Sequence, residues 1–289
     1  MFEALLDRIA AGGDSERYEV NQQGQSAPQR ENEMLGEDGL LHCCVCGDPL
    51  ETMISIPAMN ISRKVRCSCS CHMAQIKAKE EMARLEEVER TKKLCFPEPD
   101  MLKWTFANDD RQNARLSDVM MEYVENFPEF LKQKKGLLLY GTVGTGKSYY
   151  AACIANGLIE KGYKARMTSF SRLTDKLQGM FGGRQEYIDS LNDYHLLVID
   201  DLGAERKSDS GYMQEIIYDI IDSRYLAGLP LIITTNLTAE ELKFPQDIRY
   251  QRIYDRILER CHPVEVSGVS RRRQALKKTH TETKALLGL

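Results

Sequence analysis

The chain has 289 residues, enough for one large or two modest domains at roughly 150 residues per domain. Its 42% hydrophobic and 28% charged residues are typical of a globular protein, and a net charge of −4 excludes little about its partners. The sequence contains neither an apolar run as long as a membrane span nor the basic-then-apolar start of a signal peptide. We therefore expect a cytoplasmic protein without a membrane partner.

Residues 1–39 are predicted to form an N-terminal helix followed by a flexible linker. The helix would end at Gly12 and Gly13, and the polar residues after it cannot bury enough apolar surface to fold by themselves. Residues 1–40 carry nine acidic and three basic side chains, whereas residues 249–278 carry nine basic and three acidic ones. The two ends of the chain therefore differ in the charge that they offer to partners.

Residues 40–95 are predicted to form a zinc-binding module and a charged connecting helix. Six of the nine cysteines lie within residues 40–72, and in a reducing cytosol clustered cysteines hold metal more often than they form disulfides. A C-x-x-C pair followed by Gly47 is typical of one half of a tetrahedral zinc site. The predicted zinc ligands are Cys43, Cys46, Cys67 and Cys69, with Cys44, Cys71 and His72 as alternates.

Residues 141–148 read GTVGTGKS and fit the phosphate-binding (Walker A) pattern G-x-x-x-x-G-K-[ST] at every fixed position. They lie between a predicted strand and a predicted helix, which is the context that the pattern requires. Lys147 would reach the β- and γ-phosphates of ATP, and the Ser148 hydroxyl would hold Mg²⁺. The predicted nucleotide-binding residues are Gly141, Thr142, Val143, Gly144, Thr145, Gly146, Lys147, Ser148 and Asp200.

A second part of the phosphate site is predicted where an apolar strand ends at Asp200 and Asp201. Asp200 would hold Mg²⁺ together with Ser148, and Asp201 would orient or deprotonate the attacking water. Asn236 follows another apolar strand and would either hydrogen-bond the γ-phosphate or the water, or cap the helix that begins near Thr238.

From residue 96 onward, strand and helix patterns alternate, which predicts an α/β domain with a parallel sheet. The strands are predicted at 136–140, 164–169, 195–199, 230–235 and 263–266. The helices are predicted at 116–132, 147–161, 171–181, 184–193, 211–227, 238–243, 248–260 and 270–286.

Four arginines line one face of the predicted helix 248–260: Arg249, Arg252, Arg256 and Arg260. The stripe is either a solvated face paired with acids or the source of an arginine that completes the ATP site of a neighbouring subunit. Arg271, Arg272 and Arg273 open the last helix, where one of them would sense the γ-phosphate within the same chain. Candidate contacts to single-stranded DNA are Arg206, Lys207, Tyr212, Tyr250 and Tyr254.

Together these motifs resemble the AAA+ ATPases, and in particular the helicase loaders of the DnaC/DnaI type. The resemblance spans about residues 104–275. It is carried by GTVGTGKS at 141–148, LLVIDDLGAE at 196–205, TTN at 234–236 and RIYDRILER at 252–260.

The resemblance implies a five-stranded parallel sheet flanked by helices, with the ATPase domain at 96–289 and the zinc module ahead of it. It implies that Asp201 and Asn236 are catalytic, that Arg256 is the trans-acting arginine and that Arg272 is the γ-phosphate sensor. Arg252, Arg271 and Arg273 are alternatives in neighbouring register. Asp201 stands where many AAA+ proteins have Glu, so the resemblance does not fix the hydrolysis rate.

The function implied is a slow, partner- or DNA-regulated ATPase that self-associates and delivers a replicative DNA helicase to single-stranded DNA. In loaders the N-terminal domain contacts the helicase, so the zinc module would have that role. The alternative is an IstB-like transposition helper that binds duplex DNA and a transposase. A small-molecule kinase and a zinc-anchored adaptor that binds ATP without turnover are more distant alternatives.

Overall fold

The computed structural model describes residues 32–57, 61–203, 211–245 and 247–271, and seven positions between 273 and 287. The chain divides into two compact units, residues 1–82 and 83–289, and the boundary lies inside helix α2 (Ser70–Cys95). The N-terminal helix, Arg206, Lys207 and Arg272 lie outside the described residues. The domain limits that the sequence suggested, at residues 39 and 95, remain predictions.

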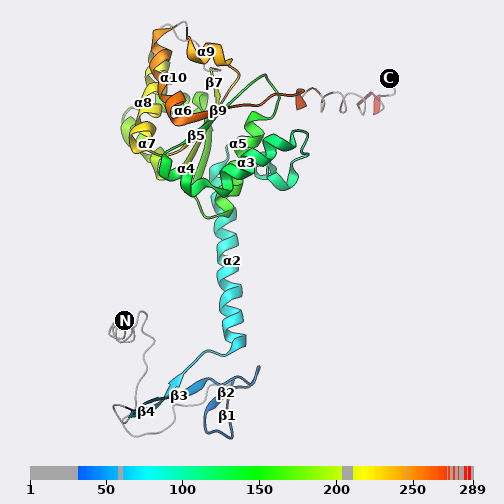
Figure 1. Cartoon of the computed structure of the whole chain (residues 1–289), viewed down its shortest axis with the longest axis vertical. Coiled ribbons are helices and arrows are strands. Elements are labelled where there is room, and N and C mark those ends of the chain that lie inside the picture. The colour runs from blue at the N-terminus through cyan, green and yellow to red at the C-terminus, as the bar shows by residue number, and fades with distance from the viewer. Residues whose placement is uncertain are drawn as a thin grey trace. The chain divides into compact units, whose positions relative to one another are not determined.

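The described part of the first unit contains two antiparallel strand pairs and the start of α2 (Figure 1). Strand β1 (Glu33–Leu35) pairs with β2 (Leu41–Cys43), and β3 (Glu51–Ile56) pairs with β4 (Ile61–Arg66). The sequence placed β1 in the flexible linker, and this was wrong for residues 33–35. Local hydrogen bonds close the β1–β2 turn: the Gly36 N–H donates to the Leu40 carbonyl at 2.8 Å.

The second unit contains a five-stranded, entirely parallel sheet, which confirms the predicted fold class. The strand order is β6-β7-β8-β5-β9. The strands are β5 (Gly136–Tyr140), β6 (Ala165–Ser169), β7 (Leu196–Leu202), β8 (Leu231–Thr235) and β9 (Cys261–Glu265). Strands β7, β8 and β5 are neighbours, so the residues that follow them meet at one edge of the sheet.

Helices cover both faces of this sheet (Figure 1). They are α3 (Ala114–Glu125), α4 (Phe127–Gln133), α5 (Lys147–Glu160), α6 (Phe170–Gln178), α7 (Arg184–Ser190), α8 (Tyr212–Ala227), α9 (Ala239–Lys243) and α10 (Ile248–Arg260). Short 3₁₀ turns lie at η2 (Pro99–Lys103), η3 (Phe106–Asn108) and η4 (Leu191–Asp193).

The helix predicted over 116–132 is two helices in the structure. Helix α3 ends at Glu125, and α4 begins at Phe127 with Pro128 in its first turn. Proline has no backbone N–H and is favoured at the start of a helix but not in its interior. Pro128 was therefore the signal for the break at Asn126.

Alternate residues of the strands enter two separate cores. Leu137 and Leu139 belong to a cluster with α5, whereas Leu138 belongs to a cluster with α6, α8 and α10. A buried parallel strand packs helices on both faces, and this explains why the strands are near-continuous hydrophobic runs. Both cores hold β5 rigidly, and β5 leads directly into the phosphate loop.

Candidate nucleotide and metal sites

The predicted phosphate loop joins the end of β5 at Tyr140 to the first residue of α5, Lys147. Gly144 has a φ of +85°, and a Cβ there would lie 2.2 Å from the Ser270 hydroxyl oxygen. A side chain at this position would be both strained and sterically blocked. The loop can therefore lie close to its surroundings while the amides at the start of α5 stay available to an anion.

The Lys147 side chain is buried at the centre of this loop. Its ammonium group donates to the carbonyls of Gly141 at 2.9 Å and Thr142 at 2.8 Å, and to Asn236 Oδ1 at 2.7 Å. The contact with Asn236 joins the first residue of α5, which follows the phosphate loop, to the residue directly after β8. Strands β5 and β8 are neighbours in the sheet, so these two residues can meet. The structure thus brings together two residues that lie 89 positions apart in the sequence.

Asp200 and Asp201 end β7 beside these residues, and Thr234 of β8 fixes both of them. The Thr234 hydroxyl donates to Asp200 Oδ1 at 2.5 Å and accepts the Asp201 N–H at 3.0 Å. The sequence pattern included Thr234 in the TTN motif but gave it no role. From the neighbouring strand it orients the Asp200 carboxylate and holds the backbone at Asp201.

The pKa of Asp200 is raised overall, chiefly by burial, although hydrogen bonds from Thr234 and Ser148 act to lower it. The neighbouring Asp201 carboxylate raises the pKa further, while the Lys147 charge lowers it. A carboxylate and a hydroxyl that share a hydrogen bond are hard oxygen donors of the kind that Mg²⁺ prefers. Ser148 and Asp200 therefore fit the predicted magnesium, which would offset triphosphate charge and keep Asp200 ionised.

Asp201 is exposed and has a φ of +59°, which is uncommon for a residue other than glycine. The backbone is irregular here, because the register between β7 and β8 shifts between Ile199 and Leu202. This bulge interrupts the regular alternation of side chains along β7 at Asp201. Its carboxylate is consequently accessible at the edge where the phosphate loop lies.

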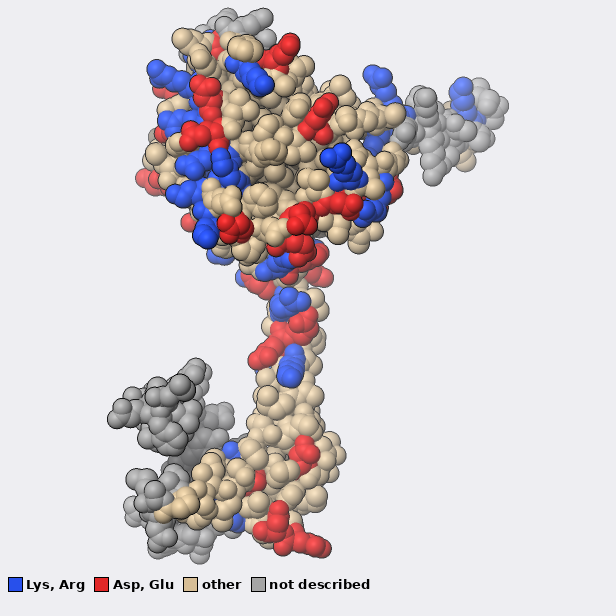
Figure 2. Space-filling view, viewed as in Figure 1, with Lys and Arg blue, Asp and Glu red and all other residues tan. Residues whose placement is uncertain are grey.

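The arginine stripe on α10 makes contacts within its own chain. Arg256 pairs with Asp222 of α8 and donates to the Tyr218 hydroxyl at 2.9 Å. Figure 2 shows acidic and basic side chains interspersed over the α8 and α10 surface, as expected for a paired stripe. A trans-acting Arg256 would have to leave Asp222, so that role remains a prediction.

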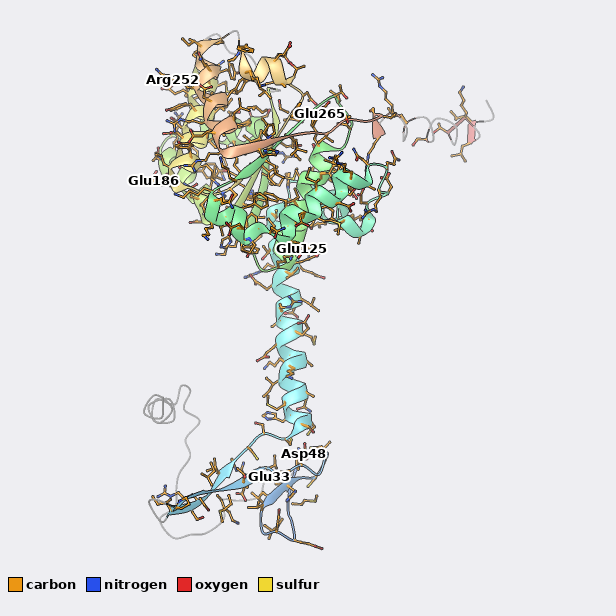
Figure 3. The ribbon with its side chains drawn as sticks, in the orientation of Figure 1. Glu33, Asp48, Glu125, Glu186, Arg252 and Glu265 are labelled. Carbon is orange, nitrogen blue, oxygen red and sulfur yellow. The ribbon has the colours of Figure 1, made fainter. Side chains whose placement is uncertain are left out.

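Arg252, the register alternative to Arg256, is exposed on α10 (Figure 3). It lines a cavity of about 520 Å³ together with Arg249, Gln214 and Tyr218. Arg252 therefore faces an open concave surface, whereas Arg256 is only partly exposed.

Arg271, the first arginine of the 271–273 run, contacts the phosphate loop. Its backbone N–H donates to the Gly144 carbonyl at 2.9 Å, and its guanidinium lies over the rings of Tyr149 and Tyr150. Arg272, the predicted γ-phosphate sensor, lies outside the described residues. The contacts of Arg271 make it the better-supported candidate for that role.

In the first unit, four thiols converge: Cys43, Cys46, Cys69 and Cys71. Their sulfur atoms all lie within 4.8 Å of one another, and the Cys69–Cys71 and Cys43–Cys71 pairs are 3.2 and 3.5 Å apart. Four thiolates around Zn²⁺, each bonded at about 2.3 Å, would be separated by about 3.8 Å. The observed spacing fits a tetrahedral zinc site with little rearrangement.

The prediction that Cys67 completes this set is corrected by the structure, which places Cys71 there. The Cys67 sulfur is exposed and donates to the Pro49 carbonyl at 3.2 Å. Cys69 precedes α2 and Cys71 lies in its first turn, so the chain bends both sulfurs back toward the Cys43–Cys46 turn. The spacing of cysteines in the sequence did not reveal this bend.

The electrostatics of the cluster also favour a cation. The backbone amides of Asp48 and Cys71 lower the pKa of Cys46 to about 6. Hydrogen bonds with Cys69, Cys43 and Cys46 raise the pKa of Cys71 instead. Crowded thiols resist joint ionisation unless a metal offsets their charge.

Two of the proposed DNA-contacting tyrosines pack against each other, and one of them is buried. Tyr254 is buried in the core, and Tyr250 packs against it with ring centroids 5.5 Å apart. An aromatic residue that the sequence interpretation missed is exposed instead. Phe181 lies fully exposed in the glycine-rich loop between α6 and α7. An aromatic followed by two glycines was the available signal.

The fold and the phosphate site define an AAA+ ATP-binding protein. Residues 68–279, more than half of the chain, match the family described as IstB-like ATP binding protein. The chain belongs to this family.

Its relatives include proteins from replication and from transposition. The replicative helicase loader DnaI of Bacillus subtilis is 28% identical over 195 residues, which is 62% of this chain and 62% of DnaI. The matched region therefore covers less than two thirds of that protein. An insertion-sequence ATP-binding protein of Mycobacterium tuberculosis is 26% identical over 202 residues, covering 67% of this chain and 77% of that protein.

Solved structures show the same similarity. The crystal structure of DnaI matches with a TM-score of 0.52 and 26% identity, covering 63% of this chain and 99% of that one. The crystal structure of the DnaC helicase loader matches with a TM-score of 0.50 and 25% identity, covering 59% and 100%. Within the residues that the structure describes, no helix is both long enough and apolar enough to span a membrane.

Proposed function

We propose that this protein is an ATP-dependent loader that delivers a DnaB-type replicative helicase onto single-stranded DNA. Lys147, Asn236 and the Asp200–Asp201 pair would surround the triphosphate of ATP. Magnesium held by Ser148 and Asp200 would neutralise developing charge, and Asp201 would orient or deprotonate the attacking water. The contact between Lys147 and Asn236 supports a single site built from both strand ends.

The four-thiol cluster ahead of the ATPase unit is the observation that favours a loader over a transposition helper. The four thiols lie within residues 32–71, and such a short segment cannot bury a sufficient core by itself. Zinc would hold this segment in one conformation, and a rigid segment at the start of the chain is suited to bind the helicase. The cytoplasm, where both ATP and replicative helicases occur, is the location that this function requires.

The alternative is an ATPase that assists a transposase on duplex DNA, and the insertion-sequence relative supports it. Mixing the full-length protein separately with a DnaB-type helicase and with an IS21-type transposase, with and without ATP, distinguishes the two. We expect a stable complex with the helicase, and light scattering measures the molar mass of that complex. A complex with the transposase alone would reject the loader assignment in favour of the helper.

The α6–α7 loop is the surface that we propose for contact with single-stranded DNA. Phe181 is flanked by Gly179 and Gly182, so its ring can present a face to a base. Two cations lie on either side of the loop along the chain: Lys176 over the Tyr187 ring and Arg184 over the Tyr212 ring. Exposed aromatics beside cations are the usual elements of sequence-tolerant single-strand binding.

Phe181→Ala is expected to weaken binding to a poly-dT oligonucleotide by about 10-fold, because stacking contributes roughly 1–3 kcal/mol per base. Fluorescence anisotropy at fixed salt measures the affinity. The matched control is Phe244→Ala, which removes the same kind of ring from another exposed position on the same unit. Equal affinities for the two variants would remove Phe181 from the DNA contact.

Self-association through the ATPase unit completes the proposal. Arg252 or Arg256 on α10 would approach the nucleotide of a neighbouring copy, which makes hydrolysis depend on assembly. This arrangement accounts for a slow ATPase that partners or DNA regulate.

A further inference from the structure

A buried carboxylate that the proposed mechanism does not use lies beside the phosphate loop. The Asp109 side chain follows η3 and is only 1% exposed. Its Oδ2 accepts a hydrogen bond from Ser117 of α3, and the Ser117 hydroxyl lies 3.3 Å from the Tyr150 hydroxyl. Its Oδ1 is also buried and accepts no hydrogen bond from any residue that the structure describes.

Such a carboxylate requires a compensating charge. Removing an ionised group from water costs several kcal/mol unless a cation or hydrogen bonds offset it. The Arg271 guanidinium supplies this charge, because its Nη1 lies 3.7 Å from Asp109 Oδ1. Asp110 is a second partner at 3.1 Å, but its side chain is 49% exposed and water screens the interaction.

Arg271 is also tied directly to the phosphate loop. Besides the backbone hydrogen bond to Gly144, its Nε lies 3.6 Å from the position that a Cβ on Gly146 would occupy. Its Nη2 donates to the Tyr150 hydroxyl at 3.4 Å. Gly146 immediately precedes α5, so the guanidinium lies beside the helix end to which a phosphate would bind.

We propose that Asp109 is a positioning residue that holds the Arg271 guanidinium beside the phosphate loop for recognition of the nucleoside triphosphate. This proposal rests on the proposed function, since it assumes that ATP binds at the loop. Asp109 itself does not touch the nucleotide. Without its charge, Asp110 is the one carboxylate partner that Arg271 keeps among the described residues, and the neutral contacts with Tyr149 and Tyr150 hold the guanidinium less firmly.

The test is a double-mutant cycle on the full-length protein. Asp109→Asn, Arg271→Ala and the double variant are compared with wild type in calorimetric titrations of Mg²⁺–ATP and Mg²⁺–ADP. Loss of one charge-assisted contact corresponds to about a 10-fold loss in affinity. We expect each single variant to bind ATP with an affinity reduced by that factor and to lose less affinity for ADP. The double variant should bind ATP no more weakly than Arg271→Ala does.

Asp118→Asn is the matched control, because Asp118 of α3 forms an exposed ion pair with Arg111 in the segment before that helix. It should leave both affinities unchanged. Thermal melting without nucleotide establishes that each variant is folded. If Asp109→Asn does not fold, Tyr150→Phe replaces it, since that change removes only the hydroxyl that contacts Arg271 and Ser117. Tyr150→Phe should also reduce the preference for ATP over ADP, as Asp109→Asn is expected to do.

The outcomes distinguish failure of the positioning role of Asp109 from failure of the proposed function. Equal weakening of ATP and ADP, or additive effects in the cycle, would show that Asp109 only supports the fold. An unchanged ATP-to-ADP ratio in Arg271→Ala would overturn the proposal as well. Failure of the wild-type protein to bind either nucleotide would instead reject the proposed function.

Discussion

Cys71→Ser is expected to abolish zinc binding by this protein, whereas Cys67→Ser is expected to leave it intact. The first change deletes a sulfur that lies 3.2 Å from Cys69 and 3.5 Å from Cys43. The second deletes a sulfur that is exposed and bonded to a backbone carbonyl. Both variants replace a cysteine sulfur by an oxygen, so any difference between them arises from the position of the residue alone.

The effect on stability should be large because binding energy at a structural zinc site is folding energy. Structural zinc contributes about 10–16 kcal/mol in small zinc-folded peptides, and this segment has little core of its own. Cys71→Ser should therefore unfold the segment around residues 32–71 while the ATPase unit stays folded.

Zinc content by atomic absorption and proteolysis of the full-length protein measure this result. The Cys71→Ser protein should contain less than half of the wild-type zinc and be cleaved within the first unit. The Cys67→Ser protein should match wild type in both measurements. Zinc loss in Cys67→Ser with retention in Cys71→Ser would restore the ligand set that the sequence suggested.

The phosphate site was predictable because its residues follow strand ends that the sequence marks clearly. Runs such as LLVID and LIITT are apolar enough to be buried, and parallel strands place their carboxyl ends at one edge. Lys147 and Asn236 were therefore assigned to one site before any contact between them was known. The sequence patterns also placed each strand of the sheet to within about two or three residues.

The parts that escaped prediction depend on contacts between segments without regular patterns. Asp109 lies in a polar stretch, NDDRQN, that reads as an exposed turn, yet α3 and Arg271 enclose it. Arg224 looks like a surface residue of an amphipathic helix but is buried, where it donates to the carbonyls of Tyr194 and Pro230. Side-chain burial of this kind is set by tertiary packing, which local periodicity does not encode.

The cysteine module shows the same limit at the level of single residues. The sequence identified the segment in which the thiols cluster but not which thiols face inward. Cys67 pairs with the backbone of residues 49 and 50, and this directs its sulfur outward. Composition alone does not show that the strand pairing continues as far as Cys67 rather than giving way to a loop.

Asp201→Asn is expected to lower the rate of ATP hydrolysis by about 100-fold or more, the range typical of losing a general base. Asparagine fits the site because it tolerates the positive φ of 59° that this position requires. It also keeps the backbone N–H that donates to Thr234, so Asp200 stays oriented. The substitution therefore removes a charge and a proton acceptor without moving the bulge.

Affinity for ATP separates this role from a general defect. Asp201→Asn should bind Mg²⁺–ATP as tightly as wild type, because in the proposed site the loop and Lys147 would hold the phosphates and Asp201 would act on the attacking water. Lys147→Ala is the comparison variant and should lose ATP affinity, since its ammonium group lies at the centre of the loop. Phosphate release at saturating ATP measures turnover. Equal turnover in Asp201→Asn and wild type would assign the activation of water to another group, and slow turnover would then reflect assembly rather than this carboxylate.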